Sequence, residues 1–221
     1  MKHFLQILTG GAAIAAVLLI GGNTTKVNGQ PRRPTNGVDP RVQIGLAIAP
    51  VPLNLQGKDV DSVGLGSYLV NVVSGCNDCH TQSPTSAFAA GRNPYFGQPK
   101  QIDPKTYLVG GRSFGSLVPN SPAIITRNLT PDKTGTTGGH TFAEFYQILT
   151  TGVDLDQAHP ACSSTVTTNC LPAPFNGSLL QVMPWPSLQN LTIEDIRAIY
   201  DYLNSIPCLE GGPGEPANRC K

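Results

Sequence analysis

Two cysteines and a histidine form the most chemically informative cluster in the sequence. Cys76 and Cys79 are separated by two residues, and His80 follows directly, which gives the pattern C-x-x-C-H. Two thiols at this spacing can add across the vinyl groups of a haem, and the adjacent imidazole can reach its iron. The pattern therefore predicts covalent haem attachment at Cys76 and Cys79, with His80 as an iron ligand.

Two other kinds of site also use closely spaced cysteines. A C-x-x-C pair occurs in thioredoxin-like redox proteins, but this chain lacks the alternating strand and helix pattern that surrounds such a pair. Half of a zinc site would need a second C-x-x-C or an H-x-x-x-H, and the sequence contains neither. We therefore favour haem over both alternatives.

The second axial ligand of the iron is expected to be Met183, the only methionine besides the initiator. It lies in the run Met183-Pro184-Trp185-Pro186, where the prolines restrict the backbone and a thioether can close the second face of a haem. An ordinary packing role is the alternative interpretation of a lone methionine. His140 and His159 are the other candidate ligands, but the first precedes a helix cap and the second lies in a polar loop.

Four further cysteines, Cys162, Cys170, Cys208 and Cys220, predict two disulfide bonds in an exported chain. Three pairings are compatible with the sequence. Pairing between neighbours would close one short loop and would pin the tail 208–221 with another. Four unpaired thiols are the alternative.

The N-terminus has the pattern of an export signal. Residues 2–22 combine a short basic start with an apolar stretch over 5–20. We predict a signal peptide over 1–29, cleaved before Gln30, and hence a periplasmic or other extracytoplasmic protein. An uncleaved leader is the alternative, and it would associate the protein with a membrane.

Three regions are expected after the leader. Residues 30–58 hold five prolines without a sustained hydrophobic period, which favours an extended tether or a strap lying on the domain. The compact domain is expected over 59–207. The tail 208–221 then follows, held by a disulfide.

The compact domain is predicted to be mainly α-helical, with long loops rich in Gly and Pro. Helices are expected at 61–75, 141–152 and 192–206, the last two because each begins with a Thr that has an acidic residue three positions later. Residues 81–140 contain many turn formers and no long periodic segment, so a cofactor is expected to organise them. No convincing pair of β-strands is predicted, although 123–125 could be extended.

Composition limits the possible partners. The chain has 15 basic and 14 acidic residues, a formal charge of +1, and no basic tract, so nucleic acid is not an expected partner. Only 39 % of the residues are apolar, while 24 are Gly and 20 are Pro. Something other than side chains is therefore expected to help fill the core.

These features resemble the class I cytochromes c, especially single-haem relatives of the cytochrome domains of alcohol and sugar dehydrogenase complexes. The resemblance extends from Gly66 to Pro207. Besides the haem motif, its elements are Gly66-Ser67-Tyr68-Leu69-Val70, Gly110-Gly111, Asn128-Leu129-Thr130-Pro131-Asp132, the helix from Phe142 to Phe145, Met183-Pro184-Trp185, and Asp195 through Tyr202-Leu203.

The resemblance implies a helical fold wrapped around one covalently attached haem c. N-terminal and C-terminal helices would cross near Gly66, and Met183 would close the far face of the haem. The implied function is one-electron transfer and not catalysis, with redox partners such as a dehydrogenase, a quinol-oxidising complex or a terminal oxidase. A haem peroxidase-like enzyme and a gas-binding or sensor module are the alternatives, and both require a displaceable Met183.

Two expectations concern the surroundings of the haem. The ring nitrogen of His80 that does not bind iron needs a hydrogen-bond acceptor, for which the carbonyl of Pro84 is a candidate. Arg112 and Arg127 could pair with the haem propionates through their forked donors, or could equally be solvated at the surface.

Overall fold

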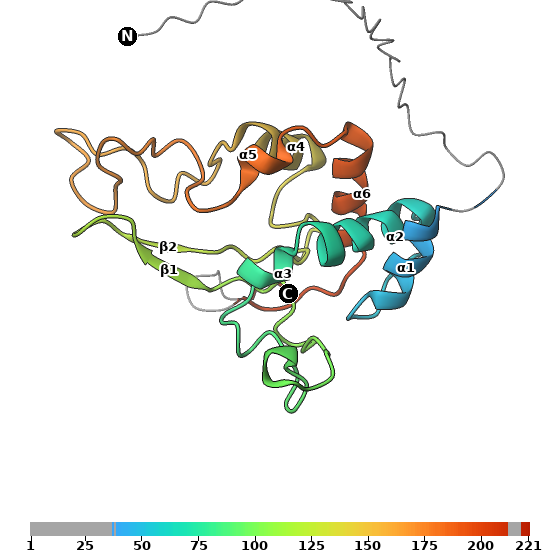
Figure 1. The fold of residues 1–221 in the computed structure, drawn as a ribbon. Coiled ribbons are helices and arrows are strands. Elements are labelled where there is room, and N and C mark those ends of the chain that lie inside the picture. Colours follow the sequence, from blue (N-terminus) through green and yellow to red (C-terminus); the bar gives the residue numbers. More distant parts are fainter. Residues whose placement is uncertain (1–36, 38, 212–217) are drawn as a thin grey trace, which may run out of the picture. The chain divides into compact units, whose positions relative to one another are not determined.

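The computed structural model describes residues 37, 39–211 and 218–221, so the predicted leader and its cleavage site lie outside the described residues. Helices provide most of the regular structure, and long loops connect them (Figure 1). The elements are α1 Pro40–Ile48, α2 Val60–Tyr68, the π-helical turn η1 Leu69–Val73, α3 Cys76–Cys79, the 3-10 turn η2 Pro94–Phe96, β1 Ser113–Ser116, β2 Ala123–Ile125, α4 Phe142–Thr151, α5 Trp185–Leu188 and α6 Ile193–Leu203.

Helices α2 and α6 cross at Gly66, where the resemblance places a helix crossing. A Cβ atom at this position would overlap the carbonyl oxygen of Ala198, so only glycine permits the two backbones to approach this closely. Ser62 strengthens the contact by donating a hydrogen bond to the Asp201 carboxylate at 2.7 Å. The crossing brings together helices that are more than a hundred residues apart in the sequence.

Residues 40–48 form a helix where the sequence analysis expected extended chain. Pro40 stands in the first turn of α1, where its missing N–H is not needed, and the Asp39 carboxylate caps the turn by accepting from the Arg41 N–H at 2.9 Å. Gly45 packs directly on Gly64 of α2, since a Cβ atom at Gly45 would overlap the Gly64 carbonyl. The other prolines of 30–58 favoured an extended chain in the sequence analysis, so this short helix was not predicted.

The helix predicted at 61–75 is present in two parts, α2 and the π-helical turn η1. The wider turn carries Asn71 into a buried polar cluster with two tyrosines from distant segments. The Tyr107 hydroxyl donates to the Asn71 carbonyl oxygen at 2.7 Å and lies 2.8 Å from the Tyr202 hydroxyl. Burial raises the pKa of both phenols, so they stay neutral and join the loop before Gly110 to α6.

Both predicted Thr start signals are confirmed. Thr141 accepts from the Glu144 N–H, and the Glu144 carboxylate accepts from the Thr141 N–H at 2.8 Å, which completes a capping box for α4. Thr192 accepts from the Asp195 N–H at 3.1 Å at the start of α6. Helix α4 ends at Gly152, as expected, with φ of 72°.

A small antiparallel sheet, β1 paired with β2, corrects the expectation that no strands would pair. The 123–125 segment was expected to be extended, but its partner at 113–116 is exposed along its whole length. Such a strand lacks the alternation of apolar and polar residues that marks a half-buried strand, so the sequence carried no signal for it.

Two disulfide bonds confirm the prediction from the cysteine count. They join Cys162 to Cys170 and Cys208 to Cys220, so neighbours pair. Cys76 and Cys79 are the free thiols of the described residues. The second bond links the residue after Pro207 to the C-terminal end of the tail.

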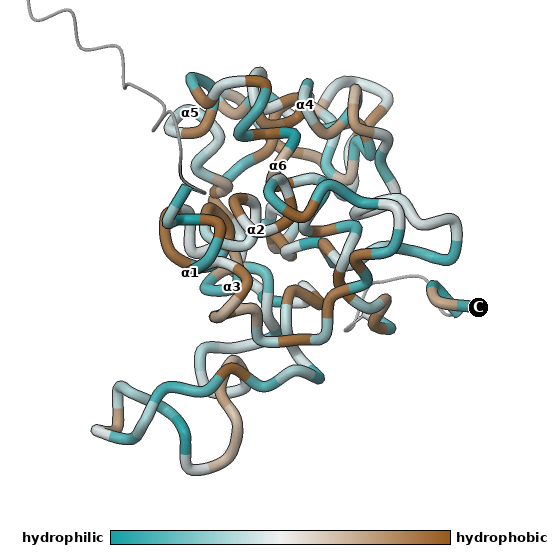
Figure 2. The backbone as a smooth tube through the Cα atoms, turned by 90° about the vertical axis from the view of Figure 1, so that its right-hand side faces the viewer, coloured by the Kyte–Doolittle hydropathy of each residue, from teal (hydrophilic) through white to brown (hydrophobic). Residues whose placement is uncertain are grey.

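Residues 82–106, called the lobe below, project from the rest of the described unit. Two views at right angles show this segment standing away from the helices (Figure 1, Figure 2). Its neck is closed by a hydrogen bond from the Thr81 hydroxyl to the Thr106 carbonyl at 3.2 Å. The lobe therefore begins and ends beside the C-x-x-C-H motif.

The close crossing at Gly66 leads to a stability prediction. We expect Gly66→Ala to lower the free energy of unfolding by roughly 1–3 kcal/mol, because the added methyl group forces the two helices apart. Alanine is the better helix former, so propensity alone predicts the opposite sign. Chemical denaturation measures the change. Gly37→Ala is the control, since that position has open space around it, and equal stability of the two variants would contradict the prediction.

Candidate functional site

The single helical turn α3 presents the C-x-x-C-H motif to a cavity. Gly75 precedes it in the left-handed conformation, with φ of 56°, and the His80 N–H donates to the Cys76 carbonyl at 2.9 Å. Cys76, Cys79 and His80 all line the same cavity. The structure thus brings together the three motif residues that the sequence analysis selected.

Burial raises the pKa of the Cys76 thiol to about 12. The thiol therefore stays protonated at neutral pH. Redox-active and metal-binding cysteines instead have lowered pKa values, because the thiolate is the reactive form. The Cys76 thiol thus lacks the lowered pKa that is typical of a thioredoxin-like redox pair.

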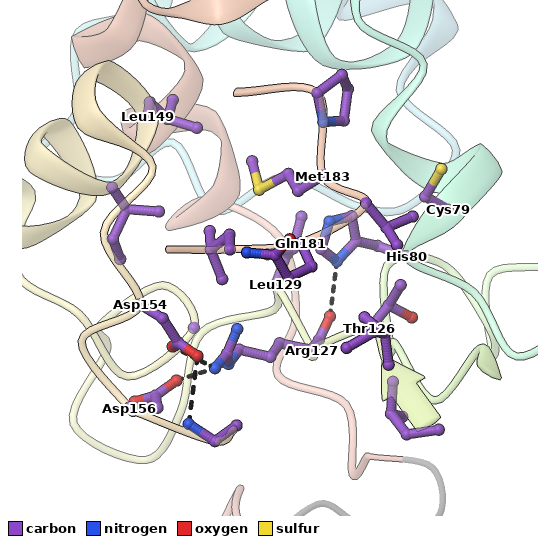
Figure 3. A pocket seen from close by; sticks show the side chains of 18 of the residues that line it. Cys79, His80, Thr126, Arg127, Leu129, Leu149, Asp154, Asp156, Gln181 and Met183 are labelled. Atoms are coloured by element: carbon purple, nitrogen blue, oxygen red, sulfur yellow. Dashed lines mark hydrogen bonds and ion pairs between the residues drawn. The ribbon is translucent and has the colours of Figure 1, made fainter. Parts of the chain in front are cut away.

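The His80 ring is held by the backbone carbonyl of Arg127, which lies 2.7 Å from Nδ1 (Figure 3). A carbonyl can only accept, so Nδ1 carries the proton and Nε2 keeps a free lone pair. Burial lowers the pKa of His80, and the Arg127 carbonyl partly opposes this shift. The expectation that Pro84 supplies the acceptor is wrong, because the partner comes from a distant loop.

The cavity measures about 420 Å³ and has mainly apolar walls. Helix α4 lines it with Phe145, Ile148 and Leu149, and Met183 enters from the segment before α5. Figure 3 shows the His80 ring and the Met183 side chain at the same cavity. Two free thiols, an oriented imidazole and a thioether around apolar walls are a donor set that fits a covalently bound haem.

Two consecutive tight turns bring Met183 to the cavity. The Met183 N–H donates to the Gln181 carbonyl at 2.8 Å, and the Trp185 N–H donates to the Met183 carbonyl at 2.9 Å. Each bond closes a γ-turn around one residue. Pro184, with φ of −80° and ψ of 44°, centres the common inverse form. Val182, with φ of 70°, centres the strained form that β-branched residues rarely adopt.

Contacts on both sides hold this strained segment in place. The Gln181 side-chain amide donates to the carbonyls of Asn176 and Leu179 at 3.0 and 2.9 Å. On the other side, the Trp185 ring covers Gly152, where a Cβ atom would overlap the indole. Strain of this kind persists only where surrounding contacts over-determine the conformation. Gln181 and Val182 therefore position Met183.

Both alternative histidines also lie at the cavity wall. His140 Nε2 is 3.7 Å from the Asp156 carboxylate, and its backbone carbonyl accepts from the Tyr200 hydroxyl at 2.9 Å. Nδ1 of His159 is buried and has no hydrogen-bond partner within the described part of the chain. Met183, His140 and His159 are thus all near the site, and the cavity alone does not choose among them.

The two arginines considered either as partners of haem propionates or as solvated surface residues contact the protein itself. Arg127 forms ion pairs with Asp154 and Asp156, each at 2.6 Å. The neighbouring His140 ring, followed by the charge of Arg127, holds the pKa of Asp156 below its ordinary value. Arg112 donates to the Asp78 carbonyl and lies 4.8 Å from the centre of the Phe114 ring.

Sequence reasoning missed several residues that shape the site. Asn77, inside the C-x-x-C-H motif, accepts from the Leu108 N–H at 2.9 Å and so connects the motif to the long loop. Asp154 and Asp156 form ion pairs with the side chain of Arg127, the residue whose backbone carbonyl orients His80. The D-x-D pattern directly after a helix end was a usable signal for these aspartates, whereas the roles of Val182 and Gln181 depend on backbone geometry.

No known protein-family profile matches the chain. Among curated proteins, it is similar to the cytochrome c subunits of alcohol dehydrogenase (quinone) from Gluconacetobacter polyoxogenes and Komagataeibacter europaeus. Each is 32 % identical over 99 residues, which cover 44 % of this chain and 17 % of the relative. The fructose dehydrogenase cytochrome subunit of Gluconobacter japonicus is 27 % identical over 142 residues, 64 % of this chain and 21 % of that relative.

The chain spans about a fifth of the length of the curated relatives it matches. All three are cytochrome subunits of dehydrogenases, so the similarity supports a cytochrome c-type electron-transfer protein in general terms. Within residues 39–211 and 218–221, no helix is long and apolar enough to cross a bilayer.

The strained turn before Met183 is open to a direct test. We expect Val182→Gly to raise the free energy of unfolding by about 1 kcal/mol, because glycine adopts a positive φ without the steric cost that valine incurs. Val182→Ala keeps that cost and should not stabilise the protein. Urea denaturation of both variants measures the difference. If glycine destabilises the protein as much as alanine does, the turn is not strained.

Proposed function

We propose that the protein is an exported monohaem cytochrome c with a class I fold, and that it carries single electrons. Cys76 and Cys79 would hold haem c covalently, and His80 and Met183 would ligate its iron. The observation that carries this proposal is the meeting of the C-x-x-C-H turn and the lone thioether at one apolar cavity. The similarity to cytochrome subunits of dehydrogenases supports it.

A bound haem would supply an iron that gains and loses one electron. The residues of the chain hold its ligands and exclude water. The Arg127 carbonyl fixes the orientation of the His80 ring, and the turns around Val182 and Pro184 direct the Met183 thioether. Apolar walls and a sulfur ligand both favour the reduced iron, which raises the potential. No catalytic acid or base is required, because no bond of a substrate changes.

Redox proteins are the expected partners. A dehydrogenase is the first candidate, given the complexes to which the relatives belong, and a quinol-oxidising complex or a terminal oxidase are the others. Cleavage of the leader over 1–29 would release the protein into the periplasm. Retention of the leader would keep the protein at the membrane. Export is also the setting in which two disulfide bonds are stable.

A protein with a displaceable sixth ligand, either peroxidase-like or gas-binding, is the second candidate. The strained turn at Val182 favours it, because a ligand held by strained backbone is released more readily. Addition of carbon monoxide to the reduced native protein separates the two candidates. Binding without denaturant would support the displaceable ligand, and absence of binding would support the carrier.

Covalent attachment predicts that haem stays with the polypeptide during acid-acetone extraction. The absorbance of the solvent and of the precipitate measures how the haem is divided between them. The double variant Cys76→Ala/Cys79→Ala should release all of its haem, because no thioether remains. Cys162→Ala/Cys170→Ala is the matched control and should retain it. Free haem from the unmodified protein would contradict covalent attachment.

Ligation by Met183 predicts a spectroscopic and electrochemical change in Met183→Ala. The weak far-red band of methionine-bound ferric iron should disappear, and the ferrous form should bind carbon monoxide. The potential should fall by on the order of 100 mV or more, because a ligand that favours Fe(II) is lost. His140→Ala and His159→Ala serve as controls. If Met183→Ala keeps its spectrum while a histidine variant loses it, that histidine is the ligand.

A further inference from the structure

The tip of the lobe exposes two adjacent aromatic side chains. Tyr95 is 81 % exposed and Phe96 is 69 % exposed, the highest values among the large apolar residues of the described part of the chain. Single exposed apolar residues are ordinary on protein surfaces. Two neighbouring aromatic rings at the end of a projecting segment indicate a contact with something outside the chain.

Hydrogen bonds within the lobe fix the turn that carries these two exposed rings. The Asn93 side chain caps the 3-10 turn by accepting from the Tyr95 N–H at 3.0 Å, and the Asn93 N–H donates to the Gln98 side chain at 2.9 Å. Behind the tip, the Ala89 N–H donates to the Gln101 carbonyl at 3.0 Å. Such internal bonds reduce the entropy lost when the tip binds a partner.

Exposed cations are present on the lobe. Arg92, Lys100 and Lys105 are exposed, and none of them forms an ion pair within the described residues. No acidic residue occurs between Asp78 and Asp103. The lobe therefore offers two unpaired cations, Arg92 and Lys100, near its aromatic tip, whereas Asp103 and Lys105 lie toward its neck.

We propose that the lobe binds the surface of an anionic lipid bilayer, with Tyr95 and Phe96 inserted at the level of the headgroups. Aromatic rings favour this interface, and a tyrosine keeps its hydroxyl in the polar layer. Arg92 and Lys100 would contact the lipid phosphates. A projecting tip fits a bilayer because lipids rearrange around it, whereas a protein partner would need a matching pocket.

Binding through the lobe would hold the haem-attachment motif beside the membrane. The neck of the lobe closes at Thr81, the residue after His80, so the motif lies at its base. The inference does not depend on the ligand assignment at the cavity, since the lobe residues take no part in that site.

The test is co-sedimentation of the haem-loaded, exported chain with dense vesicles of phosphatidylcholine alone or with phosphatidylglycerol added. Protein in pellet and supernatant is quantified on gels, so the readout does not depend on the haem. We expect binding to the anionic vesicles that weakens with salt. Tyr95→Ser/Phe96→Ser should weaken it by roughly ten-fold or more, and Lys100→Gln by about five-fold.

Phe96→Ser alone provides a second variant, because it leaves the ring contact between Tyr95 and Phe88 in place. Ile193→Ser and Lys133→Gln remove an exposed apolar and an exposed basic side chain elsewhere and should bind like the unmodified protein. All variants share one N-terminus, so differences among them report on the lobe. Equal binding of the tip variants and the unmodified protein would overturn the proposal. If the tip variants bind vesicles normally but exchange electrons more slowly with a protein partner, the proposal is also overturned, because the lobe then binds a protein and not a bilayer.

Discussion

The crossing of α2 and α6 at Gly66 is the contact on which the rest of the structure depends. Helix α2 leads through the π-helical turn directly into the C-x-x-C-H motif, and α6 follows the segment that carries Met183. Because Gly66 has no side chain, the α6 backbone packs against it. This single close approach brings the two halves of the site to one cavity, although they lie about a hundred residues apart in sequence.

The long loop between His80 and α4 is ordered by a few polar contacts and not by regular structure. The Arg127 carbonyl holds the His80 ring, Asn77 holds the Leu108 backbone, and Tyr107 joins Asn71 and Tyr202. Each contact connects the loop to the helices at a buried position, where an unpaired polar group would be costly. The same bonds that order the loop therefore also orient the proposed iron ligand.

The segments that carry the two proposed iron ligands are constrained in different ways. His80 lies on a helical turn and is oriented by a neutral hydrogen bond to a carbonyl. Met183 lies between two γ-turns, one of them strained at Val182 and held by Gln181 and Trp185. His80 is thus held by an unstrained hydrogen bond, whereas Met183 is held by a strained backbone that depends on its surrounding contacts. The lobe adds a separate surface, built on the neck beside the motif.

The sequence by itself determined the features that depend on local chemistry: the C-x-x-C-H motif, the Thr caps of α4 and α6, the stop at Gly152 and the presence of two disulfide bonds. Spacing and side-chain type carry this information along the chain. Tertiary structure alone decided that Arg127, and not Pro84, holds His80, that 40–48 is helical against Gly64, and that Val182 adopts a positive φ. Each of these depends on a partner distant in sequence or on a backbone conformation that the residue does not itself prefer, because long-range packing outweighs local propensity.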